Sequence, residues 1–145
     1  MSTATHETVL QHVVLVLGRE QYAVPIFQTR EIVRWSQPRP VPGQPEDVEG
    51  ALDLRGELVT VVDLGKRLGV PCDPNPDHRD IVVVENEGAR PLGLAVDGVL
   101  DVLDSTPDQH RPAPEGVGCA DHVNGIIVLD DRLVVSLDVS KLFRD

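Results

Sequence analysis

The stretch LDLRGELVTVVDL, residues 52–64, decides the fold. Its two mostly apolar runs flank Gly56-Glu57, and a glycine-containing pair between such runs is typical of a turn between strands. The second run, Leu58–Leu64, is rich in Val and Thr, whose β-branched side chains favour pleated strands. Asp63 can cap a short helix that follows, and Gly69 can end it. These residues predict a β-hairpin that leads into a short helix.

Outward from this hairpin, short apolar runs separated by turn residues continue along the chain. They predict strands at His12–Leu17, Tyr22–Ile26, Val48–Leu54, Ile81–Glu85, Pro91–Val96, Val99–Leu103, Gly125–Leu129 and Leu133–Leu137. Thr29–Trp35 is expected to begin as a helical turn and to continue as a strand. Thr106–Gly118, rich in Pro and Gly, is expected to be a long loop. About nine or ten short strands with turn signals every 8–12 residues are typical of an all-β barrel or sandwich.

The composition bounds the class of protein. A chain of 145 residues suits one domain that folds without metals or disulfides. We expect a flexible N-terminus at residues 1–11 and a single domain at residues 12–143. The net charge of −11 argues against binding to nucleic-acid backbones or anionic lipid. No signal peptide opens the chain, and no run approaches the roughly 20 apolar residues of a membrane span.

Catalytic and metal-binding motifs are missing from the sequence. Cys72 and Cys119 stand far apart in expected loops, so we expect reduced thiols in a cytoplasmic protein, with a structural disulfide as the alternative. His78, His110 and His122 lack the close spacing of a metal site. We therefore expect no enzyme, no metal and no cofactor. A barrel that binds oligonucleotide or a small ligand is an alternative, but it would need basic grooves or stacking aromatics, and aromatic residues make up only 3%.

A series of segments from Val13 to Phe143 carries a family resemblance. They are GREQYAVPI (18–26), TREIVR (29–34), VPGQP (41–45), VEG (48–50), LDLRG (52–56), LVTVVDL (58–64), GLAVDGV (93–99), GI (125–126) and RLV (132–134). In this order and at this spacing they resemble the CheW-like chemotaxis coupling proteins, an adaptor family. The ordered set, rather than any single segment, makes the resemblance specific.

The resemblance implies two SH3-like, five-stranded β-barrel subdomains, intertwined around a shared hydrophobic core, with short helices. It implies a non-enzymatic adaptor that couples chemoreceptors (methyl-accepting chemotaxis proteins) to a CheA-type histidine kinase. The implied partners are the regulatory domain of the kinase, the cytoplasmic tip of the receptor and other CheW-like domains in rings. The protein would be cytoplasmic and recruited to membrane-associated receptor arrays. The alternative is a specialised adaptor for motility, development or protein localisation that binds only one of these partners.

Carried over position by position, the resemblance also implies a set of partner-binding residues. They are Glu31, Ile32, Val33, Gly50, Leu54, Arg55, Gly56, Val99 and Val102. The guanidinium of Arg55 suits a carboxylate, and Glu31 is its expected intramolecular partner. The two glycines would permit turns or close approaches that a Cβ blocks. The valines Val99 and Val102 would contact a receptor helix lying in a groove. The alternative is structural: a surface ion pair, turn glycines and core valines.

Four positions depart from the family pattern. Thr29 stands where an apolar residue is usual, Asp53 replaces Asn, Thr60 replaces Pro and Gly65 replaces Arg. Thr29 and Asp53 adjoin the implied contact positions, so they bear on the identity of the partner rather than on the fold.

Overall fold

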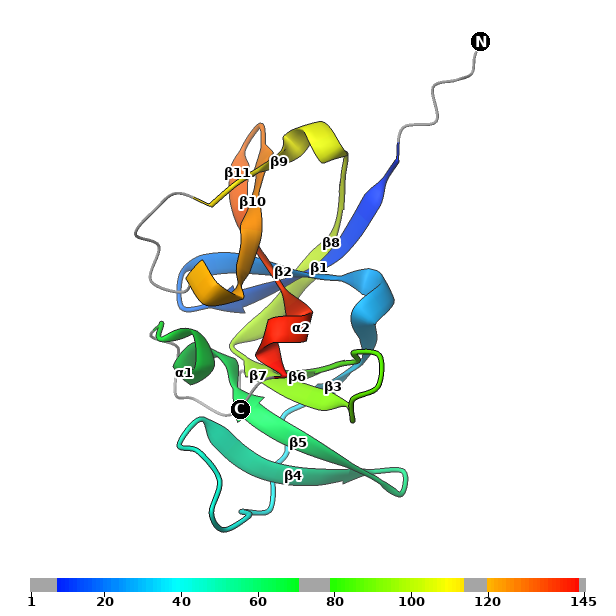
Figure 1. Cartoon of the computed structure of the whole chain (residues 1–145), viewed down its shortest axis with the longest axis vertical. Coiled ribbons are helices and arrows are strands. Elements are labelled where there is room, and N and C mark those ends of the chain that lie inside the picture. The colour runs from blue at the N-terminus through cyan, green and yellow to red at the C-terminus, as the bar shows by residue number, and fades with distance from the viewer. Residues whose placement is uncertain (1–7, 71–78, 114–119, 144–145) are drawn as a thin grey trace.

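The computed structural model describes residues 8–70, 79–113 and 120–143, whose strands form two sheets (Figure 1). Sheet 1 contains, in spatial order, β8 (Gly98–Ser105), β1 (Leu10–Leu17), β2 (Glu20–Pro25), β11 (Arg132–Leu137), β10 (Val123–Leu129) and β9 (His110–Arg111). Sheet 2 contains β3 (Thr29–Arg34), β6 (Asp80–Val84), β7 (Leu92–Val96), β5 (Glu57–Asp63) and β4 (Val48–Leu54). The expected all-β fold of two subdomains is confirmed. Sheet 2 has the expected five strands, and sheet 1 adds the two-residue β9 to five longer ones.

Sheet 2 is one continuous insertion into sheet 1. The chain leaves sheet 1 after β2, crosses through the 3-10 turn η1 (Ile26–Gln28), builds all of sheet 2, and returns at Asp97 into β8. The return is held against the β1–β2 turn, because the Gly18 amide donates to Asp97 Oδ2 at 2.6 Å. Figure 1 shows the two subdomains stacked along the long axis, with α1 (Leu64–Leu68) and α2 (Val139–Leu142) between them.

Strands that are apolar along their whole length are buried on both faces. In β1, Val13 and Leu15 face a core shared by both sheets, whereas Val14 faces a smaller core within sheet 1. In β6, Val82 faces the shared core and Ile81 a core within sheet 2. Successive side chains of a strand point to opposite faces, so an uninterrupted apolar run serves two cores at once. This explains why the runs lack the usual alternation of apolar and polar residues.

The helix predicted after the hairpin is present as α1. Asp63 is its N-cap, with its Oδ1 accepting from the Lys66 amide at 3.1 Å, and Gly69 ends it with a φ of 75°. The turn before β5 lies at Arg55-Gly56, one residue earlier than expected, because Glu57 already pairs with Leu54.

Other local expectations need correction. The helical turn expected within Thr29–Trp35 lies before it, as η1, and Thr29 already belongs to β3. β1 begins at Leu10 rather than at His12, because Leu10 pairs with Ser105 of β8. The loop expected at Thr106–Gly118 contains a 3-10 turn, η3 (Pro107–Gln109), and β9. A reciprocal capping box between Thr106 and Gln109 stabilises that turn.

Candidate partner-binding surfaces

Two ion pairs join the opposite edges of sheet 2. β3 is one edge strand, and the β4–β5 hairpin forms the other edge. Arg55 Nη2, at the tip of the hairpin, donates to Glu31 Oε2 on β3. Beside it, Arg30 Nη1 donates to Glu57 Oε1 at 2.6 Å. β3 forms no backbone ladder with β4 or β5, so these side chains connect the two edges and close the sheet into a barrel. The expected ion pair between Glu31 and Arg55 is present.

The tip of the hairpin presents Arg55 outward. Arg55 has a φ of 54° and Gly56 a φ of 87°, so both central residues of the turn lie in the left-handed region. The Gly56 amide donates to Asp53 Oδ1 at 2.7 Å, so the Asp53 side chain caps the turn. An Asn at this position could accept the same bond, so the departure at Asp53 preserves the turn and adds a negative charge beside Arg55. The Arg55 side chain stays largely exposed, with 72% of its surface accessible.

Gly50 permits a close backbone approach. Its φ is 142°, and a Cβ built there would lie 2.1 Å from the carbonyl oxygen of Arg39. Arg39 and Ala51 exchange two backbone hydrogen bonds of 2.9 Å, which fix the Pro-rich segment before β4 against the edge of sheet 2. Gly50 is itself buried, so it shapes this edge through the backbone.

The remaining implied residues of sheet 2 divide by strand alternation. Ile32 faces solvent, whereas Val33 and Leu54 are half-buried against the core of sheet 2. Arg30, Glu31, Ile32, Arg55 and Glu57 lie together at this edge of sheet 2, here named the ionic edge; Glu31 is half-buried and the other four are exposed. Leu58, next to Glu57, is also exposed, on the outer face of β5.

A second exposed surface lies on β8, the edge strand of sheet 1. Val102 is 53% exposed and pairs with Val13, which belongs to the shared core, so Val102 lies beside the junction of the two subdomains. Val99 is half-buried against the same core. Between them Leu100 is 52% exposed and has no partner in β1, because the register shifts there as in a β-bulge. Val99, Leu100 and Val102 form what is here named the apolar strand face.

An ion pair holds the solvent side of β8 in place. Arg132 Nη1 on β11 lies 3.0 Å from Asp101 Oδ2, and Arg132 Nε donates to Gln21 on β2 at 3.0 Å. The hydrogen bond to Asp101 raises the pKa of Arg132 above its ordinary value. β8 is thus fixed to the opposite hairpin of its own sheet while the apolar strand face stays uncovered.

Some surface residues escaped the sequence reasoning. Leu100 lies in a mixed run whose outward face depends on the bulge, which has no local signal. Leu58 could have been found, because it alternates with Thr60 on the outer face of β5. Arg30 and Glu57 pair across two strand edges that are distant in sequence.

The described ranges hold no cluster of three or more His, Cys, Asp or Glu side chains arranged for a metal ion. Among the same residues, no helix has the length and hydropathy needed to cross a membrane. Cys72, His78 and Cys119 lie outside the described residues.

Comparisons with known proteins address the family directly. The family model described as CheW-like domain matches residues 11–145. The chain belongs to the CheW family. The chemotaxis protein CheW of Klebsiella aerogenes is 36% identical over 98% of this chain and 87% of its own length. The chemotaxis protein CheW of Bacillus subtilis is 29% identical over 95% of this chain and 89% of its own.

A solved CheW structure matches the whole architecture. The crystal structure of the scaffolding protein TtCheW from Thermoanaerobacter tengcongensis superposes with a TM-score of 0.88 at 30% identity, covering 95% of this chain and 94% of the other. The CheW family therefore accounts for both subdomains, and a scaffold or adaptor class of protein follows from it. Within this CheW-like chain, the ionic edge and the apolar strand face lie on different sheets.

Proposed function

We propose that this protein is a non-enzymatic, cytoplasmic adaptor that couples a chemoreceptor to a CheA-type histidine kinase. The observation that carries the proposal is the presence of two exposed surfaces of different chemistry on the two subdomains. One molecule can thereby hold two partners at once, without competition for a single site. Such bridging raises the effective concentration of one partner near the other.

The ionic edge is the proposed site for the regulatory domain of the kinase. Its ion pairs are exposed, and such pairs contribute only about 0–1 kcal/mol to folding. They can therefore be exchanged for intermolecular pairs at small cost in stability. The guanidinium of Arg55 presents several donors in a rigid fork, which suits a carboxylate on a partner. Exposed Ile32 and Leu58 add apolar area on the outer face of the strands that carry these charges. Other CheW-like domains, which share this architecture, could occupy the same edge in ring assemblies.

The apolar strand face is the proposed site for the cytoplasmic tip of the receptor. An amphipathic helix binds by laying its apolar side against an apolar groove or strip. Leu100 and Val102 provide such a strip, and half-buried Val99 continues it toward the shared core. The position beside the junction means that a helix bound there would contact the region where the subdomains meet. Recruitment of the adaptor to membrane-associated receptor arrays would follow from this contact.

The two surfaces are connected through packed structure. β8 pairs with β1, β1 contributes Val13 and Leu15 to the shared core, and β6 contributes Val82 to the same core. β6 in turn pairs with β3, which carries Glu31. A change at one surface that shifts this packing would alter affinity at the other, and such coupling is reciprocal in free energy.

The experiment that tests the proposal is the formation of a three-component complex from purified protein, kinase regulatory domain and receptor cytoplasmic fragment. Light scattering after size-exclusion chromatography would report its mass. We expect Arg55→Glu to remove the kinase domain and retain the receptor, and Val102→Asp to do the opposite. Arg19→Glu, in the exposed β1–β2 turn, and Leu133→Asp, on β11, are the matched controls.

Two outcomes would contradict the proposal. Loss of both partners in each variant would mean that the surfaces are not separate, and no binding to either partner would remove the assignment. Stable binding to one partner only would instead identify a specialised adaptor.

A further inference from the structure

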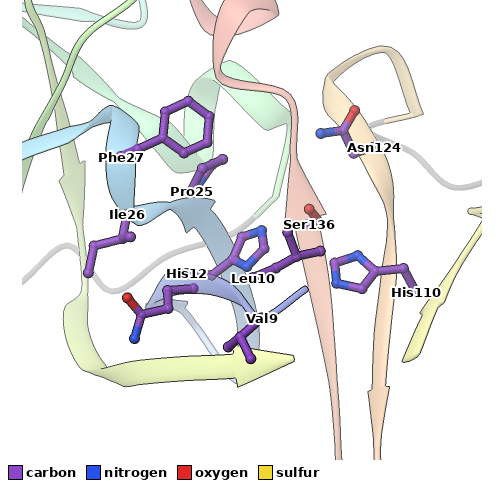
Figure 2. A pocket seen from close by; sticks show the side chains of 10 residues that line it. Val9, Leu10, His12, Pro25, Ile26, Phe27, His110, Asn124 and Ser136 are labelled. Atoms are coloured by element: carbon purple, nitrogen blue, oxygen red, sulfur yellow. The ribbon is translucent and has the colours of Figure 1, made fainter. Parts of the chain in front are cut away.

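A pocket of about 460 Å³ opens in sheet 1, at a place that the proposed adaptor function does not use (Figure 2). It lies between the start of β1, the end of β2 with η1, and strands β9, β10 and β11. Its size falls within the range of about 300–1,000 Å³ typical of small-molecule sites. One side is apolar and includes Ile26 and Phe27 of η1, and Phe27 is 85% exposed.

The polar side of the pocket contains a buried histidine with an unused nitrogen. His12 is only 6% exposed, and its Nδ1 has no hydrogen-bond partner among the described residues. A buried polar atom without a partner destabilises the folded protein, and a ligand that pairs with the atom would remove that cost. His12 comes from β1, where its neighbours across the ladder are Pro25 and Leu103, neither of which can titrate.

A second histidine faces the first across the pocket. The ring centroids of His12 and His110 lie 5.8 Å apart at an angle of 42°, and Figure 2 shows both rings beside Ser136. His110 Nε2 lies 2.9 Å from Ser105 Oγ, which holds that ring in place. Burial, and secondarily the proximity of His110, lower the pKa of His12 below its ordinary value of 6.5. An anion between the rings would oppose both effects.

The charge around the pocket is unusual for this chain. Of the Asp and Glu residues within the described ranges, none lines the pocket. Of the acidic residues on adjoining elements, Asp104 accepts from the Gln11 amide at 2.9 Å and Asp108 accepts from the Thr106 hydroxyl. Both carboxylates thus have hydrogen-bond donors of their own, and among the described lining residues no negative side chain would repel a bound anion.

We propose that this pocket binds a small molecule composed of an apolar ring or chain and one carboxylate. The carboxylate would accept from the Nδ1–H of His12, and the apolar part would cover Ile26 and Phe27. Ser136 and Asn124, which also line the pocket, supply further donors. The site would make the adaptor responsive to a soluble ligand independently of its two partner surfaces.

An NMR titration of the full chain with three matched probes tests the proposal. Phenylacetate, 2-phenylethanol and phenethylamine share an aromatic ring and differ in whether the polar end is anionic, neutral or cationic. We expect saturable shifts at His12, His110 and Phe27 with phenylacetate, at least about tenfold tighter binding than with the alcohol, and the weakest binding with the amine. His12→Phe should remove the preference for the acid, and His122→Phe, outside the pocket, should leave it intact.

Three results would overturn the proposal. They are the absence of saturable shifts with phenylacetate, equal or tighter binding of the alcohol or the amine, and an unchanged preference for the acid in a folded His12→Phe variant. The comparison of the three probes uses the unaltered protein, so it does not depend on whether the variant folds.

Discussion

The two subdomains treat their edge strands in opposite ways. Sheet 2 joins its edges by exposed ion pairs, Glu31 with Arg55 and Arg30 with Glu57. Sheet 1 ties β8 to β11 through Asp101 and Arg132 but leaves Leu100 and Val102 exposed on either side of Asp101. Exposed edge strands invite aggregation, and charged residues along them are a common protection. This difference indicates that charges at the ionic edge would orient a partner and give specificity, whereas the apolar strand face would gain binding free energy from the removal of water.

The largest expected effect concerns the backbone contact between Gly50 of β4, an edge strand of sheet 2, and Arg39. Gly50→Ala places a Cβ against the carbonyl oxygen of Arg39, so the backbone must move, and we expect a loss of at least about 3 kcal/mol in the free energy of unfolding. Gly56→Ala is the control: its φ is also positive, at 87°, but its Cβ would meet nothing within 4 Å. That variant should lose about 1 kcal/mol.

Urea unfolding followed by the fluorescence of Trp35 would measure both variants, because this sole tryptophan packs against the core of sheet 2. Equal losses for the two glycine variants would show that the contact with Arg39 yields easily.

The next effect concerns the apolar strand face. Leu100→Ala removes half-exposed apolar surface from the bulge, and we expect binding of the receptor fragment to weaken by about 1–2 kcal/mol, roughly tenfold, with unchanged binding of the kinase domain. Calorimetry with each partner separately would measure it. Leu133→Ala, at an even more exposed leucine on β11, should change neither affinity, and a similar loss there would mean that β8 is not the specific contact.

A smaller effect concerns the ion pair of Arg55 and the salt dependence of binding at the two surfaces. Arg55→Gln removes the partner of Glu31, and we expect the free energy of unfolding to change by less than about 1 kcal/mol, because the pair is exposed. Raising the salt concentration should weaken binding of the kinase domain much more than binding of the receptor fragment, since salt screens surface charges. Titrations at low and high salt would check this, and equal salt dependence for both partners would contradict the contrast between the surfaces.

The smallest effect should come from pH and should originate in sheet 1. The pKa of His12 is lowered in the folded protein, so below about pH 6.5 the unfolded chain binds a proton there before the folded one. The free energy of unfolding therefore has its full value above the ordinary pKa of 6.5, and it decreases as the pH falls from there toward the lowered pKa of His12. Urea unfolding at about pH 7.5 and 5.5 should show a larger loss for the native protein than for His12→Phe. An identical or smaller loss would contradict the assignment.

The sequence predicted features that depend on neighbouring residues. The strand runs, the cap at Asp63 and the end of α1 at Gly69 follow from local chemistry, and the ordered motifs predicted the family. Features that depend on distant backbone were missed or misplaced. The bulge at Leu100 requires β1 as a partner, and the clash that makes Gly50 necessary involves Arg39 on a separate segment. The roles of the implied binding residues stay predictions, although their placement divides them into exposed and half-buried groups.

The insertion of sheet 2 between β2 and β8 sets an order for biosynthesis. All strands of sheet 2 lie between residues 29 and 96, whereas sheet 1 requires Tyr22 to meet Val135 in the β2–β11 pair. Sheet 2 can form while the end of the chain is still within the ribosome, but sheet 1 cannot close until β11 has emerged. Until then β1 and β2 expose apolar side chains destined for the shared core, including Leu15 and Val24. During that interval the residues of sheet 2 that face the shared core, such as Val82 and Leu94, also lack their packing partners on sheet 1.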